Sequence, residues 1–466
     1  MASEGISFSE SIRESSACPE ETLDGGDDKG IIEVGVLSME CRFPQALSLG
    51  EFWSCLRSGI SCSGSLADTP HQGVGSFDAQ FFDVSSAEAM SMDPQQRLLL
   101  EVTWNALEHL NQPASRVLSN VNVGVFIGSG KSEYADQCAN DPNPLLTSGL
   151  AASALSGRLS HFFGWQGPCM SVDTATSSSL VAVCLANTSI RERECDVAIV
   201  GGVSVHTSPV QEARWRNSGL LSRAGECRAF DSAASGTVRS EGCAVAVLAR
   251  ESVGLAQPLA VLLGAAMNHT GIAESLLSPT TSSQEGVAAL ALQRAGVHPS
   301  QVQVLEAHGT GTILGDETEA RALSRVYGGY DRCQAIVLSS VKTNIGHTEA
   351  AAGLAGIIKL VLCLKSGVIP RHAQFESASS RMVDFAAIPA ILPTVEMEWR
   401  QSNGRRRIGG VSSIGMSGTN AHVIVGEYLQ RSHPAEPQDE NNIHCFDSLS
   451  TDFHIFCISA ESEKSL

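Results

Sequence analysis

The chain has 466 residues, of which 43% are hydrophobic and 17% charged, and it contains 43 glycines. This composition excludes a disordered protein and suits a large, tightly packed α/β enzyme, although only 5% of the residues are aromatic. The formal net charge of −19 excludes a general nucleic-acid surface, because such a surface must offer many cations to phosphate groups.

The 14 cysteines show no C-x-x-C spacing of the kind that holds a structural metal, and the first residues do not resemble a secretory leader. We therefore predict no metal site and reduced thiols in an intracellular protein, cytoplasmic by default. No apolar run reaches the length of a transmembrane helix, since the run that begins at Ala350 is interrupted by Lys359.

The N-terminal half predicts an alternation of strands and helices. Residues 1–30 are acidic and rich in serine, so we predict a disordered tail. Buried strands are expected where aliphatic residues run together, at 31–37, 121–127, 196–205 and 243–248. Between the first two strands, residues 93–110 show helical periodicity, with Pro94 in the first turn.

The segment 173–180 (DTATSSSL) lies between an apolar strand-like segment and an apolar helix-like segment. A run of serine and threonine has poor helix propensity but good capping groups, and it predicts a strand that turns sharply onto a buried helix. Such an elbow would leave Thr176 exposed above the sheet, beside the positive end of the helix, which is a position for a nucleophile. Taken in isolation, the segment also fits an ordinary helix cap.

A second alternation follows in the C-terminal half. Helices are expected at 284–295, 316–327 and 349–364, and strands at 302–306, 335–340, 409–413 and 421–425. This order predicts largely parallel sheets with right-handed crossovers. Two such halves, 31–280 and 281–428, predict a duplicated, layered α/β/α/β/α body with the site where their loops meet. Residues 429–466 would form a linker and the start of a further segment.

Three glycine-rich turns each follow a predicted strand of the second half, at 306–312 (EAHGTGT), 342–347 (KTNIGH) and 415–420 (GMSGTN). A single histidine is usually a core residue, and a single Gly-Thr-Gly-Thr is usually a turn. Two histidines and a lysine on one layer of loops indicate a site. His308, Lys342 and His347 are therefore candidate catalytic residues.

Several separated segments together resemble the β-ketoacyl synthase domain of polyketide synthases and related multifunctional fatty-acid synthases, over residues 31–428. Besides the elbow and the three turns, they are 39–44 (MECRFP), 92–101 (MDPQQRLLLE), 227–231 (CRAFD), 239–242 (RSEG) and 418–422 (GTNAH). The resemblance implies a thiolase-like fold, which is a duplicated five-layer α/β/α/β/α structure, and a homodimer.

The resemblance also implies an activity, the decarboxylative condensation of an acyl group with a malonyl unit on the phosphopantetheine of acyl carrier protein. The domain itself would bind no cofactor. Thr176 stands where the family has the cysteine that accepts the acyl chain. His308 and His347 would assist decarboxylation and stabilise the enolate, and Lys342 would organise this pair electrostatically. The backbone N–H groups of Thr176 and Met416 would form the oxyanion hole.

The remaining implied assignments concern the substrate channel. Thr310 and Thr312 would line the phosphopantetheine channel, and Ile414, beside Gly415, lies where the family usually has a phenylalanine gate. Thr176 is a poor substitute for a thiol, because an aliphatic hydroxyl is far more basic and needs an adjacent base to act as a nucleophile. Its methyl group also restricts χ1 and competes for the pocket. We therefore expect impaired condensation.

Four alternatives remain open at this point. A ketosynthase-type acyltransferase could condense weakly through Thr176 or by direct transfer. A malonyl-carrier decarboxylase could supply starter units without a covalent acyl-enzyme. A non-catalytic partner could bind carrier protein, or position 176 was altered to trap a complex. Retention of His308, His347 and Lys342 favours the two enzymatic alternatives, and a trap would more naturally carry alanine, serine or glutamine.

Overall fold

The computed structural model of the chain describes residues 33–66, 75–110, 118, 121–330, 335–378, 390–401 and 405–429. One compact unit ends at Tyr428 and a second begins at Leu429. The predicted tail at 1–30 and nearly all of the predicted segment at 429–466 lie outside the described residues. Within those residues, no helix is both long enough and apolar enough to cross a lipid bilayer.

A mixed sheet forms the centre of the first unit. Its strands are β1 (Val34–Arg42), β2 (Val123–Gly128), β3 (Cys169–Val172), β4 (Val197–Ser204), β5 (Gly242–Arg250), β6 (Ala260–His269), β7 (Val304–Glu306), β8 (Ile336–Ser339), β10 (Ala390–Ile391), β12 (Ile408–Ile414) and β13 (Thr419–Gly426). In the described part of the chain they follow the order β10-β8-β7-β12-β13-β6-β1-β5-β4-β2-β3. The short strands β9 (Val368–Ile369) and β11 (Met397–Glu398) pair separately.

The described helices are α1 (Leu49–Ser58), α2 (Ser86–Ser91), α3 (Pro94–Glu108), α4 (Tyr134–Gln137), α5 (Leu146–Gly149), α6 (Ser153–Phe163), α7 (Ser178–Arg191), α8 (Pro209–Asn217), α9 (Thr281–Ala295), α10 (Ile313–Tyr327), α11 (Lys342–Ile345) and α12 (Ala352–Ser366). The predicted helix at 93–110 is confirmed as α3, where Asp93 accepts a hydrogen bond from the N–H of Gln95 and Pro94 occupies the first turn. The predicted helix at 349–364 begins as a 3-10 turn and becomes α12 only at Ala352.

The prediction of largely parallel sheets was wrong. β1 runs antiparallel to both β5 and β6, β4 runs antiparallel to β5, and β13 runs antiparallel to β12 and β6. The hairpin β12–β13 has a physical reason, because the few residues from 415 to 418 can connect two strands only in antiparallel fashion. The long strand β6 was not predicted, since its almost continuous apolar sequence lacks the alternation that distinguishes a strand from a buried helix.

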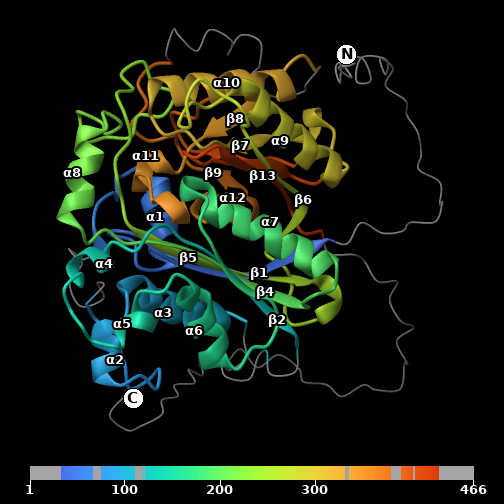
Figure 1. Cartoon of the computed structure of the whole chain (residues 1–466). Coiled ribbons are helices and arrows are strands. Elements are labelled where there is room, and N and C mark those ends of the chain that lie inside the picture. The colour runs from blue at the N-terminus through green and yellow to red at the C-terminus, as the bar shows by residue number, and fades with distance from the viewer. Residues whose placement is uncertain are drawn as a thin grey trace, which may run out of the picture. The chain divides into compact units, whose positions relative to one another are not determined.

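The elements are arranged in five layers, which fits the expected α/β/α/β/α body (Figure 1). α7 contacts β2 and β4 on one side of the sheet order and β6 and β13 on the other side, and α12 packs beside it. α3 and α6 cover the outer face of the N-terminal half, whereas α9 and α10 cover the C-terminal half. The two halves of the sheet meet where residues 34–36 of β1 pair with residues 260–262 of β6.

The central helices pack against their neighbours through positions that lack a Cβ atom. A Cβ added to Gly128, at the end of β2, would lie 2.4 Å from the backbone nitrogen of Ser179 on α7. A Cβ on Gly353 of α12 would lie 2.6 Å from the Cβ of Leu180. Glycine at these two positions therefore fixes the depth at which α7 lies between β2 and α12.

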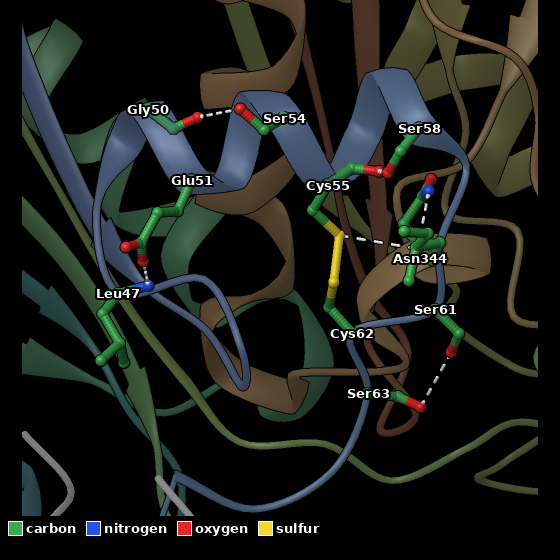
Figure 2. Close-up of a disulfide and its surroundings, with 11 residues drawn as sticks. Leu47, Gly50, Glu51, Ser54, Cys55, Ser58, Ser61, Cys62, Ser63 and Asn344 are labelled. Atoms are coloured by element: carbon green, nitrogen blue, oxygen red, sulfur yellow. Dashed lines mark hydrogen bonds between the residues drawn. A yellow bond between two sulfur atoms is a disulfide. The ribbon is translucent and has the colours of Figure 1, made fainter. Parts of the chain in front are cut away.

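A disulfide joins Cys55, in the last turn of α1, to Cys62 (Figure 2). The prediction that all cysteines are reduced was wrong for this pair, whereas eight other described cysteines are free. The helix ends at Gly59, whose φ of +67° turns the chain back and brings the two Cα atoms to 7.0 Å. The N–H of Cys62 donates to the carbonyl of Asn344 at 2.6 Å, so this loop packs against the predicted turn at 342–347.

We expect Gly128→Ala to lower the free energy of unfolding by about 2 kcal/mol, because its new methyl group would meet backbone atoms that cannot rotate away. Urea unfolding should be compared with that of Gly157→Ala on α6, whose added Cβ meets no heavy atom within 4 Å. That control should gain about 0.5–1 kcal/mol from its better helix propensity. Equal stability of the two variants would contradict the close approach of α7 to β2.

Candidate active site

A strained elbow presents Thr176, as the sequence predicts. After β3, a single 3-10 turn (Ala175–Ser177) leads into α7. The N–H of Ala175 donates to Oδ1 of Asp173 at 2.9 Å, and Ala175 has a φ of +58°, which non-glycine residues rarely adopt. Thr176 is not exposed as expected, because the β12–β13 turn covers it and leaves only 6% of its surface accessible.

The hydroxyl of Thr176 is engaged by a backbone carbonyl. It donates to the oxygen of Ile414 at 2.6 Å, and the hydroxyl of Ser413 donates to the carbonyl of Thr176 at 2.9 Å. Both bonds tie the elbow to β12. A hydroxyl becomes nucleophilic only when a base takes its proton, and a backbone carbonyl is not such a base. In this geometry Thr176 is therefore held but not activated.

A cavity of about 220 Å³ opens beside Thr176 and brings the candidate residues together. The rings of His308 and His347 line it, with their centroids 5.5 Å apart and their planes at 82°. The other candidate residues that line the same cavity are Thr310, Thr312, Ile414, Gly415 and Met416. The elbow of one half and three loops of the other half thus form one site, at the place where the sequence predicts it.

Lys342 is the one candidate residue that does not line the cavity. It is buried behind His308, and its Nζ donates to the backbone carbonyl of His308 at 2.6 Å. Burial lowers the pKa of Lys342, while the nearby Cys227 thiol and the carboxylates of Glu306, Glu319 and Asp316 act in the opposite direction. Lys342 thus acts on the site by fixing the His308 backbone and by its positive charge.

Both histidines of the cavity are neutral at neutral pH. Burial, followed by the charge of Lys342, lowers the pKa of His308 well below its ordinary value and lowers the pKa of His347 to about 3. The N–H of Glu349 donates to Nδ1 of His347 at 3.1 Å, so the ring hydrogen of His347 is on Nε2. Nδ1 of His308 is buried and has no hydrogen-bond partner among the described residues. Neutral imidazoles of this kind serve as hydrogen-bond donors.

Two carboxylates that the sequence analysis missed hold the loop of His308. Glu319 accepts the N–H groups of His308 and Gly309 at 2.7 and 2.8 Å, and Asp316 accepts the N–H of Gly311 at 3.1 Å. Burial raises the pKa of Asp316 to about 7. The sequence did contain a signal for these two acids. Both lie in the first two turns of the helix that follows the glycine turn, where side chains commonly accept hydrogen bonds from free N–H groups.

The mouth of the cavity is apolar, which the sequence analysis also did not predict. Leu276, Leu277 and Leu314 line it with exposed side chains, and Trp215 lines it from α8. No arginine or lysine is among the described residues of the lining. The described part of the chain also holds no cluster of histidine, cysteine, aspartate and glutamate that could bind a metal ion.

Comparison with known proteins identifies the family. Residues 32–253 match the family described as "Beta-ketoacyl synthase, N-terminal domain", and residues 259–376 match the family described as "Beta-ketoacyl synthase, C-terminal domain". The chain belongs to the β-ketoacyl synthase family. The predicted resemblance is thereby confirmed, and this ketosynthase domain is of the type found in polyketide synthases.

Curated relatives and solved structures agree with this assignment. The ketosynthase domain is 42% identical over 437 residues to a phenolphthiocerol/phthiocerol polyketide synthase of Mycobacterium tuberculosis, with 87% of the chain and 23% of that protein covered. It is 39% identical over 436 residues to erythronolide synthase EryA3 of Saccharopolyspora erythraea, with 88% of the chain and 14% of that protein covered. The chain thus spans less than a quarter of the length of these relatives.

The fold is similar to that of solved ketosynthases. The ketosynthase from module 6 of the bacillaene synthase from Bacillus subtilis 168 gives a TM-score of 0.79 at 31% identity, with 85% of this chain and 72% of that chain covered. The oxazolomycin ketosynthase domain OzmH KS7 of Streptomyces albus JA3453 also gives 0.79, at 32% identity, with 87% and 76% covered. The predicted thiolase-like fold is confirmed.

We expect His347 to remain neutral between about pH 8 and about pH 5 in ¹⁵N NMR spectra, since its pKa is about 3. The half-exposed His109 is the matched control, because its hydrogen bond to Glu40 raises its pKa, so its ring should be protonated at about pH 5, where that of His347 is not. Titration of His347 together with His109 would contradict the buried, neutral site.

The lowered pKa of His347 also makes the free energy of unfolding depend on pH. In the unfolded chain His347 binds a proton near about pH 6.5, whereas in the folded protein it does so only near pH 3. The unfolded state therefore binds more protons as the pH falls below about 6.5, and His347 lowers the free energy of unfolding by up to about 1.4 kcal/mol per pH unit in that window.

Proposed function

We propose that this ketosynthase domain acts on acyl and malonyl groups carried as thioesters on the phosphopantetheine of acyl carrier protein, with condensation impaired at Thr176. Family membership supports the substrate class. The observation that carries the proposal is that two neutral histidines share one cavity with Thr176, whose hydroxyl is engaged by the carbonyl of Ile414.

The malonyl half of the reaction requires no covalent acyl-enzyme. The bond between the malonyl Cα and its carboxylate breaks, CO₂ leaves, and the electron pair passes to the thioester to give an enolate. The Nε2–H of His347, together with His308, donates to the enolate oxygen. If no acyl group is attacked, a proton from water reaches Cα and an acetyl thioester results. Because no lysine or arginine lines the described cavity, a bound carboxylate has no counter-ion there, which favours its loss as neutral CO₂.

The acyl half of the reaction is where this chain departs from the family pattern. The backbone N–H groups of Thr176 and Met416 are proposed to hold the thioester carbonyl, and Thr310 and Thr312 to line the path of the pantetheine. The apolar mouth supports an apolar acyl group rather than a charged one. Acyl transfer to Thr176 itself would be slow, because its hydroxyl donates to the carbonyl of Ile414 instead of to a base and must first leave that carbonyl.

A malonyl-carrier decarboxylase that supplies starter units is the second candidate function. The observation that favours it is the hydrogen bond between the Glu349 N–H and Nδ1 of His347, which leaves the Nε2–H of His347 as a donor whether or not position 176 is reactive. The two candidates share the decarboxylation step and differ only in the fate of the enolate.

We expect Thr176→Cys to form an acyl-enzyme when it is mixed with acyl-loaded carrier protein, because the elbow and both histidines are already in place. The wild-type domain should release CO₂ from malonyl-loaded carrier without elongating an acyl chain, and His347→Ala should slow that release by about 10²-fold or more. Mass spectrometry of the protein and measurement of CO₂ check both results.

The control for this series is Thr188→Cys, which places a thiol on the exposed side of the same helix and should not be acylated. A wild-type domain that elongates chains as fast as Thr176→Cys would overturn the proposal. A domain that binds carrier protein but shows neither CO₂ release nor condensation, even as Thr176→Cys, would instead be a non-catalytic partner.

We further propose a homodimer, as the family resemblance implies. β3 is an edge strand of the sheet, and Cys169 and Met170 on it are exposed, so its unpaired backbone groups offer a place for a second copy of this chain.

Sedimentation at micromolar concentration should show a dimer. Met170→Lys should weaken the dimer by at least about tenfold, because it places a charge on the proposed interface strand. Met90→Lys on α2, also an exposed methionine, should leave the dimer unchanged. A stable monomer of the wild-type domain would contradict the proposal.

A further inference from the structure

Glu349 adopts a backbone conformation that is unusual for its residue type. Its φ is +43°, in the left-handed region that favours glycine. In this conformation its N–H donates to Nδ1 of His347 at 3.1 Å. The strained backbone of Glu349 thus provides the N–H that bonds Nδ1 of His347. Such strain persists only where another interaction maintains it.

The carboxylate of Glu349 provides such an interaction. Its Oε1 accepts a hydrogen bond from Nε of Arg239 at 2.6 Å and lies 3.3 Å from Nε2 of His206. Burial by itself would raise the pKa of Glu349, but hydrogen bonds to His206 and Arg239 and their charges outweigh burial and lower this pKa to about 2. The carboxylate is therefore ionised and held from two sides.

Arg239 is anchored independently of Glu349. Its side chain is 7% exposed, forms an ion pair with Glu133, lies 3.6 Å from a carboxylate oxygen of Glu212 and stacks over Trp215 at 5.4 Å from the ring centroid. Glu133 in turn accepts the backbone N–H groups at positions 207 and 208. A guanidinium fixed by this many contacts is a rigid support for a carboxylate.

The backbone on either side of Arg239 also forms hydrogen bonds with the backbone of His347. The N–H of His347 donates to the carbonyl of Val238 at 2.7 Å, and the N–H of Ser240 donates to the carbonyl of His347 at 3.1 Å. The segment 238–240 thus contacts His347 through its backbone on both sides of Arg239, and through the Arg239 side chain it contacts the residue that occupies Nδ1.

We propose that the Arg239–Glu349 ion pair, with His206 as a second partner of the carboxylate, is a positioning device that keeps His347 as the Nε2–H tautomer facing the cavity. A neutral imidazole can carry its hydrogen on either nitrogen, and only the Nε2–H form donates into the site while Nδ1 accepts from Glu349. The catalytic consequence rests on the proposed function, whereas the effect on the tautomer does not.

The test uses Glu349→Ala in the full chain, because alanine keeps the strain of a φ of +43° and has no carboxylate to maintain it. Glu349→Gly is the companion variant, since glycine adopts this φ without strain and should keep both the backbone N–H on Nδ1 and the single tautomer. The first variant is the one that should change. In ¹⁵N NMR spectra of histidine-labelled protein, wild-type His347 should be a single Nε2–H tautomer, and Glu349→Ala should show a mixture of both tautomers. The kcat for CO₂ release from malonyl-loaded carrier should fall about tenfold or more, with KM unchanged.

Two further variants keep the test specific. Arg193→Ala is the matched control, since Arg193 is exposed beyond the end of α7 and has a φ of +63°, and it should change neither readout. Arg239→Lys keeps the charge but lacks Nε of the guanidinium, so it should give an intermediate tautomer mixture. If Glu349→Ala keeps a single Nε2–H tautomer and the wild-type kcat, the positioning device is refuted.

Failure of the proposed function would look different. If the wild-type protein released no CO₂ while the tautomer of His347 still depended on Glu349, the positioning device would stand and the proposed activity would fall. If CO₂ release were normal while the tautomer ignored Glu349, the positioning device would fall and the proposed activity would stand.

Discussion

The placement of α7 between the two halves of the sheet is the constraint on which the site depends. Thr176 lies in the 3-10 turn that leads into α7, while the histidines and the covering turn come from the C-terminal half. These segments meet only because α7 approaches β2 and α12 closely, through positions such as Gly128 and Gly353 that have no side chain to keep them apart. The packing of this single helix thus brings residues of both halves of the fold into one site.

Buried charges form the second layer of the site. Lys359 pairs with Glu306 at 2.8 Å, Glu306 also accepts the hydroxyl of Ser339, and Lys342 lies among further carboxylates behind His308. Buried ions are costly unless they are paired, so each of these groups is constrained by its partners. At the cavity, burial and the charge of Lys342 keep the two histidines uncharged.

The sequence alone predicted those parts of the structure that depend on local chemistry. The Asp93-Pro94 start of α3, the elbow at Thr176 and the three glycine turns have signals within a few residues, and each was found. The candidate roles of individual residues came from the family resemblance, since spacing by itself left an ordinary helix cap and core histidines as alternatives.

Features that depend on distant parts of the chain were missed. Arg239 and Glu349 are 110 positions apart, and nothing in either neighbourhood indicates that they pair. The hydroxyl of Thr176 is held by Ile414 at the end of β12, 238 positions away. The antiparallel course of β1, β5 and β6 and the disulfide at Cys55 likewise follow from tertiary packing, which periodicity and spacing do not record.

The hydrogen bond from Thr176 to Ile414 has a consequence beyond reactivity. The proposed oxyanion donors lie on two separate segments, the elbow and the β12–β13 turn, and this bond fastens one segment to the other. A thiol is a weak donor and would leave that fastening loose, whereas the threonine hydroxyl is a strong one. The same hydroxyl that is held away from chemistry thus limits the relative motion of the two segments that carry the proposed donors.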